Sequence, residues 1–72
     1  EGMQIDLKVS AQWMQKSAEA GFVPAMYELG AMYEKGLNVP IDRSQAIHWM
    51  QEAAKRGHKK AIAWLERNLL NS

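Results

Sequence analysis

The 72-residue sequence predicts an all-α fold, an α-α superhelix (solenoid) of about four helices in antiparallel pairs. Apolar residues recur at helical spacing along the chain, without the alternation that marks strands. The second 36 residues also repeat the first, with identities at Ile5/Ile41, Asp6/Asp42, Trp13/Trp49, Met14/Met50, Gln15/Gln51, Ala18/Ala54, Gly21/Gly57, Ala25/Ala61 and Leu29/Leu65. A unit of this length cannot bury its apolar face alone, so it stacks on a neighbouring unit.

Aspartate and proline indicate where the helices begin. Asp6 and Asp42 each precede a run with helical periodicity, where a carboxylate can accept the free amides of a helix N-terminus. Gln45, three residues after Asp42, completes a loose capping box. Pro24 suits the first position of the second helix because it has no amide hydrogen. The fourth helix is expected from about Lys59 to Leu70.

Glycine and asparagine indicate where the helices end. Gly21 and Gly57 follow the first and third periodic runs, where a left-handed residue lets the chain reverse direction. Gly36–Pro40 interrupts the second run, and Asn38 is expected to be left-handed there.

The apolar stripes predict the core. Their members are Val9, Trp13, Met14 and Ala18, then Ala25, Met26, Leu29, Met32 and Tyr33, then Ala46, Ile47, Trp49, Met50, Ala53 and Ala54, and finally Ala61, Ile62, Leu65 and Leu69. Trp13 and Trp49 occupy equivalent positions, and both are expected in the core. Trp64 stands at a usually polar position, and we expect it to cover the end of the array, the alternative being an exposed anchor for a partner.

Composition excludes several classes of protein. A net charge of +1 gives no argument for nucleic acid or for an anionic membrane. With no Cys, disulfides and thiolate chemistry are ruled out. No apolar stretch approaches the roughly 20 residues of a membrane span. The compartment stays unknown, because bacterial cytoplasm and periplasm are both compatible with a soluble chain of this composition.

No catalytic or metal site can be assembled from the sequence. His48 and His58 are ten residues apart, one on a helix and one just beyond Gly57, so we interpret both as solvated. Paired catalytic carboxylates, a Ser-His-Asp order and a phosphate-binding glycine loop are all missing. We therefore expect no cofactor, no metal and no enzymatic activity.

A short basic cluster surrounds Gly57. Lys55 and Arg56 complement the negative end of the third helix, and Glu52 can pair with Arg56 at i+4. The remaining cations, Lys59 and Lys60, open the next helix, where positive charge is unfavourable. These two lysines are either solvated or serve an anionic partner.

The order Ala25-x-x-x-Leu29-Gly30-x-x-Tyr33-x-x-Gly36, then Asp42, Ala46-x-x-Trp49 and Ala53-Ala54-x-x-Gly57-x-x-x-Ala61 resembles the Sel1-like repeat, a family of tetratricopeptide-type α-solenoids. The resemblance covers the whole chain as one domain, with a half unit at 1–24, a complete unit at 25–60 and a half unit or C-terminal cap at 61–72. Departures are Asn38 for glycine, Glu66 for the Gly30 equivalent and Leu69 for Tyr33. A glutamate prevents close helix packing, so we expect the array to end there.

This resemblance implies an adaptor that binds a protein or peptide, possibly acidic, on the concave face lined by the first helix of each pair. The residues expected to contact the partner are Tyr27, Ala31, Glu34, Lys60, Ala63 and Arg67. No nucleic acid and no membrane insertion are expected. The weakest alternative is an enzyme that acts on penicillin-type compounds, as suggested for some relatives, because the sequence contains no recognisable pair of a nucleophile and a general base.

The main alternative is a self-associating structural module. Two units fall short of the roughly three that make a stacked array stable, which suggests the C-terminal piece of a longer array or a module that pairs with another copy. A marginally stable monomer is the third possibility. Trp13 and Met14 lie on a helix without a preceding partner helix, so residues 1–20 are expected to form a homo-oligomer or to contact a neighbour.

Overall fold

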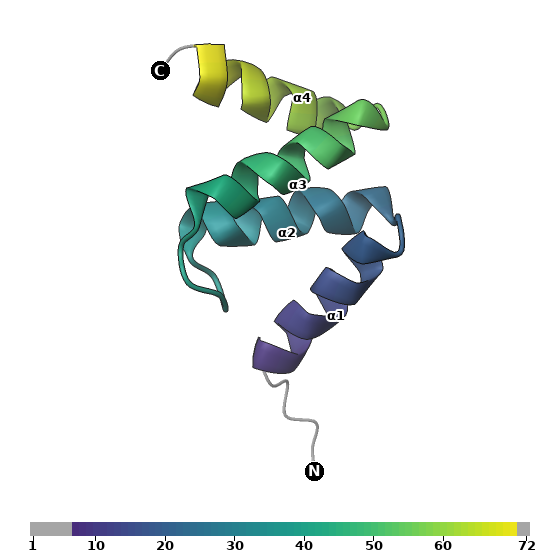
Figure 1. The fold of residues 1–72 in the computed structure, drawn as a ribbon, viewed down its shortest axis with the longest axis vertical. Helices are drawn as coiled ribbons and strands as arrows, with labels where there is room; N and C mark the ends of the chain where they lie inside the picture. The colour runs from purple at the N-terminus through teal and green to yellow at the C-terminus, as the bar shows by residue number, and fades with distance from the viewer. Residues whose placement is uncertain (1–6, 71–72) are drawn as a thin grey trace.

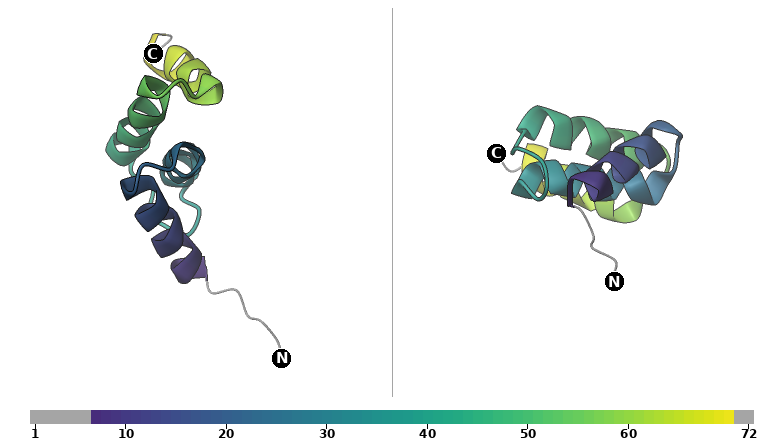
Figure 2. Two further views of the ribbon diagram at one scale, coloured as in Figure 1. Left: turned by 90° about the vertical axis from the view of Figure 1, so that its right-hand side faces the viewer. Right: turned by 90° about the horizontal axis from the view of Figure 1, so that it is seen from below.

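The computed structural model describes residues 7–70 and confirms the all-α fold. Its elements are α1 (Leu7–Glu19), α2 (Val23–Lys35), α3 (Arg43–Lys55), α4 (Lys59–Leu65) and the π-helical segment η1 (Glu66–Leu70). Consecutive helices reverse direction and stack in chain order, with α1 and α4 at opposite ends of the stack (Figures 1 and 2). Within residues 7–70, no helix is both long and apolar enough to cross a membrane.

The helix boundaries lie close to the capping and turn residues that the sequence predicts. Asp42 caps α3 as predicted, because its Oδ1 accepts a hydrogen bond of 3.2 Å from the amide of Gln45. Gly21 and Asn38 have φ angles of +98° and +64°, so both are left-handed as expected. Pro24 is the second residue of α2, one place later than predicted, because α2 begins at Val23. Asp6, the other predicted cap, lies outside the described residues.

The core is centred on the contact between α2 and α3. Leu29 of α2 and Met50 of α3 are its largest fully buried side chains. The two helices approach closely at Gly30, where an added Cβ would lie 3.2 Å from the carbonyl oxygen of Ala46 and from two side-chain atoms of Met50. Two small residues of α3, Ala46 and Ala53, are also fully buried.

The prediction that both equivalent tryptophans lie in the core is correct for Trp49 and wrong for Trp13. Trp49 is 7% exposed, whereas Trp13 is 67% exposed. The difference arises from position in the stack. Helix α3 packs against α2, but none of the described helices occupies the equivalent place beside α1 (Figure 1). Trp13 therefore has the same sequence context as Trp49 without the helix that would bury it.

The predicted stripe of the last helix is also partly wrong. Ala61 is buried as expected, but Trp64 is the second buried residue, while Ile62 and Leu69 are 39% and 41% exposed. The helix does not stay regular over its predicted length, since the α-helical geometry ends at Leu65 and η1 follows. A π-helical turn shifts the angular position of every later side chain, so a periodicity of 3.6 residues no longer predicts which way Leu69 faces. Ile62 lies before η1, and its exposure does not have this cause.

Trp49→Ala should be the most damaging single substitution, with a loss of about 3 to 5 kcal/mol in the free energy of unfolding, because a large buried side chain leaves a cavity. Trp13→Ala makes the same chemical change at the equivalent but exposed position, and its cost should stay below about 1 kcal/mol. Urea unfolding followed by circular dichroism measures both. Equal losses for the two variants would contradict the burial assigned here.

Candidate functional site

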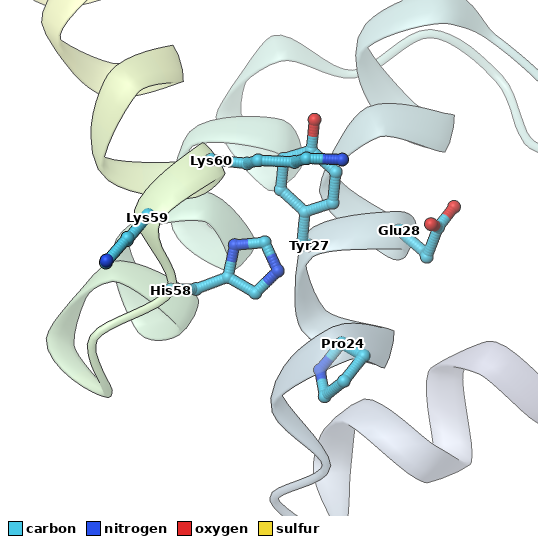
Figure 3. A pocket seen from close by; sticks show the side chains of 6 residues that line it. All are labelled: Pro24, Tyr27, Glu28, His58, Lys59 and Lys60. Carbon is cyan, nitrogen blue, oxygen red and sulfur yellow. The ribbon is translucent and has the colours of Figure 1, made fainter.

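A surface pocket lies between α2 and the start of α4. Its volume is about 320 Å³, and it is lined by Pro24, Tyr27, Glu28, His58, Lys59 and Lys60. The first three side chains come from α2, and the last three come from the residues that open α4 (Figure 3). The turn at Gly57 brings these two groups together, because it folds α4 back across the stack.

A pair of stacked rings forms the back of this pocket. The rings of Tyr27 and His58 lie 4.7 Å apart between centroids, at an interplanar angle of 15°. His58 is also the N-cap of α4, because its Nδ1 accepts a hydrogen bond of 3.2 Å from the amide of Ala61. The interpretation of His58 as a solvated histidine is therefore wrong. Its ring is half-buried and fixed from two sides, which makes the pocket wall rigid.

The two lysines of the pocket differ in direction. The Lys60 side chain extends toward the side of the pocket where Tyr27 lies, whereas Lys59 points away from Tyr27 (Figure 3). Both side chains are exposed. Within the described residues, neither lysine belongs to an ion pair. Lys60 thus offers the pocket an ammonium group that is free to bind an anion.

The other cations of the basic cluster are already paired. Arg56 Nη1 lies 2.9 Å from Glu52 Oε1, as predicted, and Lys55 Nζ lies 3.3 Å from Glu52 Oε2. The hydrogen bond from Arg56, followed by that from Lys55, lowers the pKa of Glu52 below its usual value. The cluster therefore divides into two cations paired with Glu52 at the end of α3 and two lysines without an ion pair among the described residues at the start of α4.

Trp64 closes the far end of the same surface. It is 4% exposed, so it covers the end of the stack as expected and is not an exposed anchor. Its Nε1 donates a hydrogen bond of 2.9 Å to Glu34 Oε1. Glu34, one of the residues expected to contact a partner, is half-buried, and the indole holds one of its two carboxylate oxygens. The two residues are 30 apart in sequence, so no helical spacing could have revealed their contact.

The structure brings some of the predicted contact residues together and separates others. Tyr27 and Lys60 line one pocket. Ala31 is half-buried against the core, and Ala63 is exposed on α4. Arg67 is exposed on η1, and the expectation that it shares one regular helix with Lys60 fails where the π-helical segment begins at Glu66. The role of His58 in this pocket was not predicted from the sequence, because histidine is not among the preferred N-cap residues.

Comparison with known proteins places this arrangement in a family. The family model described as Sel1 repeat matches residues 1–22, 23–58 and 55–67. The chain belongs to the Sel1 repeat family. Such repeats are generally protein-interaction modules.

A curated Sel1 repeat relative, Chitin synthase regulatory factor 3 of Schizosaccharomyces pombe, is 42% identical over 60 residues. The match covers 83% of this chain and 6% of that protein, so the chain spans a small fraction of the relative's length. No solved structure gives a significant match.

This Sel1 repeat chain shows no assembled metal site in its described part. Within residues 7–70, no group of three or more His, Cys, Asp or Glu side chains is placed to hold a metal ion. His48 is exposed, and its ring contacts Trp49 edge-on at 4.9 Å between centroids. His58 is engaged by Tyr27 and by the amide of Ala61. The two histidines thus have separate surroundings, His48 in the middle of α3 and His58 at the N-cap of α4.

Trp64→Phe should lower the free energy of unfolding by about 1.5 to 3 kcal/mol, because it removes the donor to Glu34 and leaves a half-buried carboxylate without that hydrogen bond. Glu34→Gln is the matched control, since its amide oxygen can still accept from the indole and it should cost less than half as much. Urea unfolding of the three chains makes the comparison. A Trp64→Phe chain as stable as the wild type would show that this hydrogen bond contributes nothing.

Proposed function

We propose that this Sel1 repeat chain is a non-catalytic adaptor module that binds an acidic, extended segment of a protein partner. The binding surface runs along α2 and α4 and is called here the α2–α4 surface, defined by Tyr27, Ala31, Lys60, Ala63 and Arg67. The observation that carries the proposal is the pocket in which the unpaired Lys60 stands beside the rigid stack of Tyr27 and His58.

The pocket supports recognition of a carboxylate. A volume of about 320 Å³ accommodates one side chain. Lys60 has no ion pair within the described residues, so it can form a charge-assisted hydrogen bond with an incoming carboxylate without first losing another partner. The ring wall is already fixed by the cap of α4, so little side-chain entropy is lost when the partner binds.

The rest of the surface supports an extended backbone. Ala31 and Ala63 are small, so a peptide can lie close to α2 and α4 between the two cationic ends. Lys60 lies on α4 and Arg67 on η1, and their separation of seven residues corresponds to at most roughly 10 Å along the axis at about 1.5 Å per residue of regular helix. An extended peptide covers that distance in about three residues. The preferred partner segment therefore carries two acidic residues about three positions apart.

A binding role also agrees with the residues available for chemistry. The six residues that line the pocket include no serine, threonine or cysteine, so it has no hydroxyl or thiol nucleophile other than the stacked Tyr27. The Nδ1 atom of its histidine accepts the capping hydrogen bond of α4, so that nitrogen is not available as a general base. The curated relative is named as a regulatory factor, and regulation through binding is consistent with a non-catalytic assignment.

The double variant Lys60→Glu, Arg67→Glu should bind a fluorescein-labelled peptide with two glutamates three residues apart at least about 30-fold more weakly than the wild type. This loss corresponds to about 2 kcal/mol of binding free energy. The substitutions replace attraction by repulsion at both ends of the α2–α4 surface. Fluorescence anisotropy measures the affinity, and circular dichroism checks that both exposed substitutions leave the fold intact. Equal affinities for wild type and double variant would move the binding surface elsewhere.

Lys59→Glu is the matched control for Lys60→Glu. It makes the same change of charge on the neighbouring residue, but the Lys59 side chain points away from Tyr27 (Figure 3). We expect Lys59→Glu to weaken binding by less than about threefold, through the long-range field alone. If the two single variants lose the same affinity, the peptide senses net charge, and the pocket is not the binding site.

A further inference from the structure

The pocket between α2 and α4 carries an anion as well as a cation. Glu28 of α2 and Lys60 of α4 both line it, and both side chains are exposed. In the view of Figure 3, Tyr27 lies between His58 on one side and Glu28 on the other. Lys60 extends from α4 toward the α2 side of the pocket. The pocket therefore presents groups of both charges to a ligand.

The two charged groups do not neutralise each other. Within the described residues, neither Glu28 nor Lys60 belongs to an ion pair or to a side-chain hydrogen bond. The neighbouring cations of the basic cluster, Lys55 and Arg56, are both paired with Glu52. A ligand that binds Glu28 and Lys60 together therefore breaks no existing contact of either side chain.

Nothing in α2 engages the carboxylate of Glu28. An acidic residue on a helix usually gains stability from a cation three or four residues away, or from the positive end of the helix. Glu28 is the sixth residue of α2, beyond its first turn. The residues three and four positions away, none of them charged, are Pro24, Ala25, Ala31 and Met32. The carboxylate is thus free to take part in recognition.

We propose that Glu28 determines the specificity of this pocket, by selecting a partner segment with a basic residue close to the acidic residue that Lys60 binds. This inference rests on the function proposed above, because it concerns the same pocket and the same partner. A carboxylate placed beside Glu28 is repelled, whereas an ammonium or guanidinium group is attracted. Charges arranged in this way across an interface decide mainly which partner binds and in which register.

The spacing of the partner's charges follows from the geometry of an extended chain. Successive side chains point to opposite faces, so residues two positions apart share a face and lie about 7 Å from each other. A basic residue two positions from the acidic one can therefore face Glu28 while the acidic residue contacts Lys60. The stretch that continues toward Arg67 runs over the uncharged Ala31 and Ala63, so the basic residue stands outside it. The predicted segment is basic-x-acidic-x-x-acidic, in either chain direction.

The probes are fluorescein-labelled hexapeptides with capped ends that differ at one residue. The basic probe is Lys-Ala-Glu-Ala-Ala-Glu, the acidic probe has glutamate in place of the lysine, and both are also made in reverse order. Fluorescence anisotropy is measured at low ionic strength, because salt screens exposed charges. We expect the wild-type chain to bind the basic probe at least about fivefold more tightly than the acidic probe, in one of the two orders.

Net charge cannot produce this preference. The chain has a net charge of +1, and the acidic probe is the more negative of the two peptides. Long-range attraction therefore favours the acidic probe. Tighter binding of the basic probe requires a local contact with an anion of the chain.

Three variants assign that contact. Glu28→Gln removes the charge and keeps the shape of the side chain, so the basic probe should lose its advantage. Glu28→Lys should invert the preference, with the acidic probe bound at least about fivefold more tightly. Glu19→Gln is the matched control, because it removes the same charge from an exposed residue of α1 outside the pocket, and it should keep the wild-type preference. Circular dichroism checks that each exposed substitution leaves the fold intact.

The outcomes separate this inference from the function on which it rests. A wild-type chain that binds the acidic probe as tightly as the basic one, or more tightly, would overturn the role of Glu28 and leave acidic-segment binding intact. A Glu28→Gln chain that keeps the preference, or a Glu19→Gln chain that loses it, would do the same. Failure of the wild-type chain to bind any of the probes would overturn both the role of Glu28 and the proposed binding function.

Discussion

The close crossing of α2 and α3 at Gly30 is the contact on which the rest of the structure depends. A hydrogen atom in place of a side chain lets α2 approach the backbone of α3 at Ala46. At that separation Leu29 and Met50 are completely buried, and Trp49 is nearly so. Interiors are packed so densely that one added carbon at this point must displace backbone or the Met50 side chain. The repeat can therefore stack only where a small residue stands at the crossing.

Helix α4 is positioned by two side-chain contacts to α2, one ring stack and one hydrogen bond, in addition to its packing on α3. The stack of Tyr27 and His58 fixes its first turn, and the hydrogen bond between Trp64 and Glu34 fixes its last. These contacts hold two helices that are not neighbours in sequence at a constant spacing, which keeps the surface between them preformed. A preformed surface binds with a smaller loss of conformational entropy than a flexible one, so the same contacts that complete the fold also support its proposed role in binding.

The two ends of the stack differ for a physical reason. At the α4 end, Trp64 turns inward to Glu34 and Glu66 replaces the glycine of the crossing, so both size and charge oppose another helix. At the α1 end, Trp13 and Phe22 remain exposed. Buried apolar surface stabilises a contact by about 25 cal/mol per Å². A neighbouring helix would therefore be stabilised more by packing on the α1 end than on the α4 end, so the two ends of the stack are not equivalent.

The sequence by itself determined the family, the four helices and all their described ends except the C-terminal end of α4, because periodicity, the Asp42 cap and the left-handed residues Gly21 and Asn38 act over a few residues only. It also indicated Tyr27 and Lys60 as members of one surface. Only the tertiary structure decided which of two equivalent tryptophans is buried, that Glu34 is taken up by Trp64, and that His58 is a cap within a ring stack. Each of these depends on a contact between residues far apart in the chain, or on the absence of a neighbouring helix among the described residues, and local pattern contains neither.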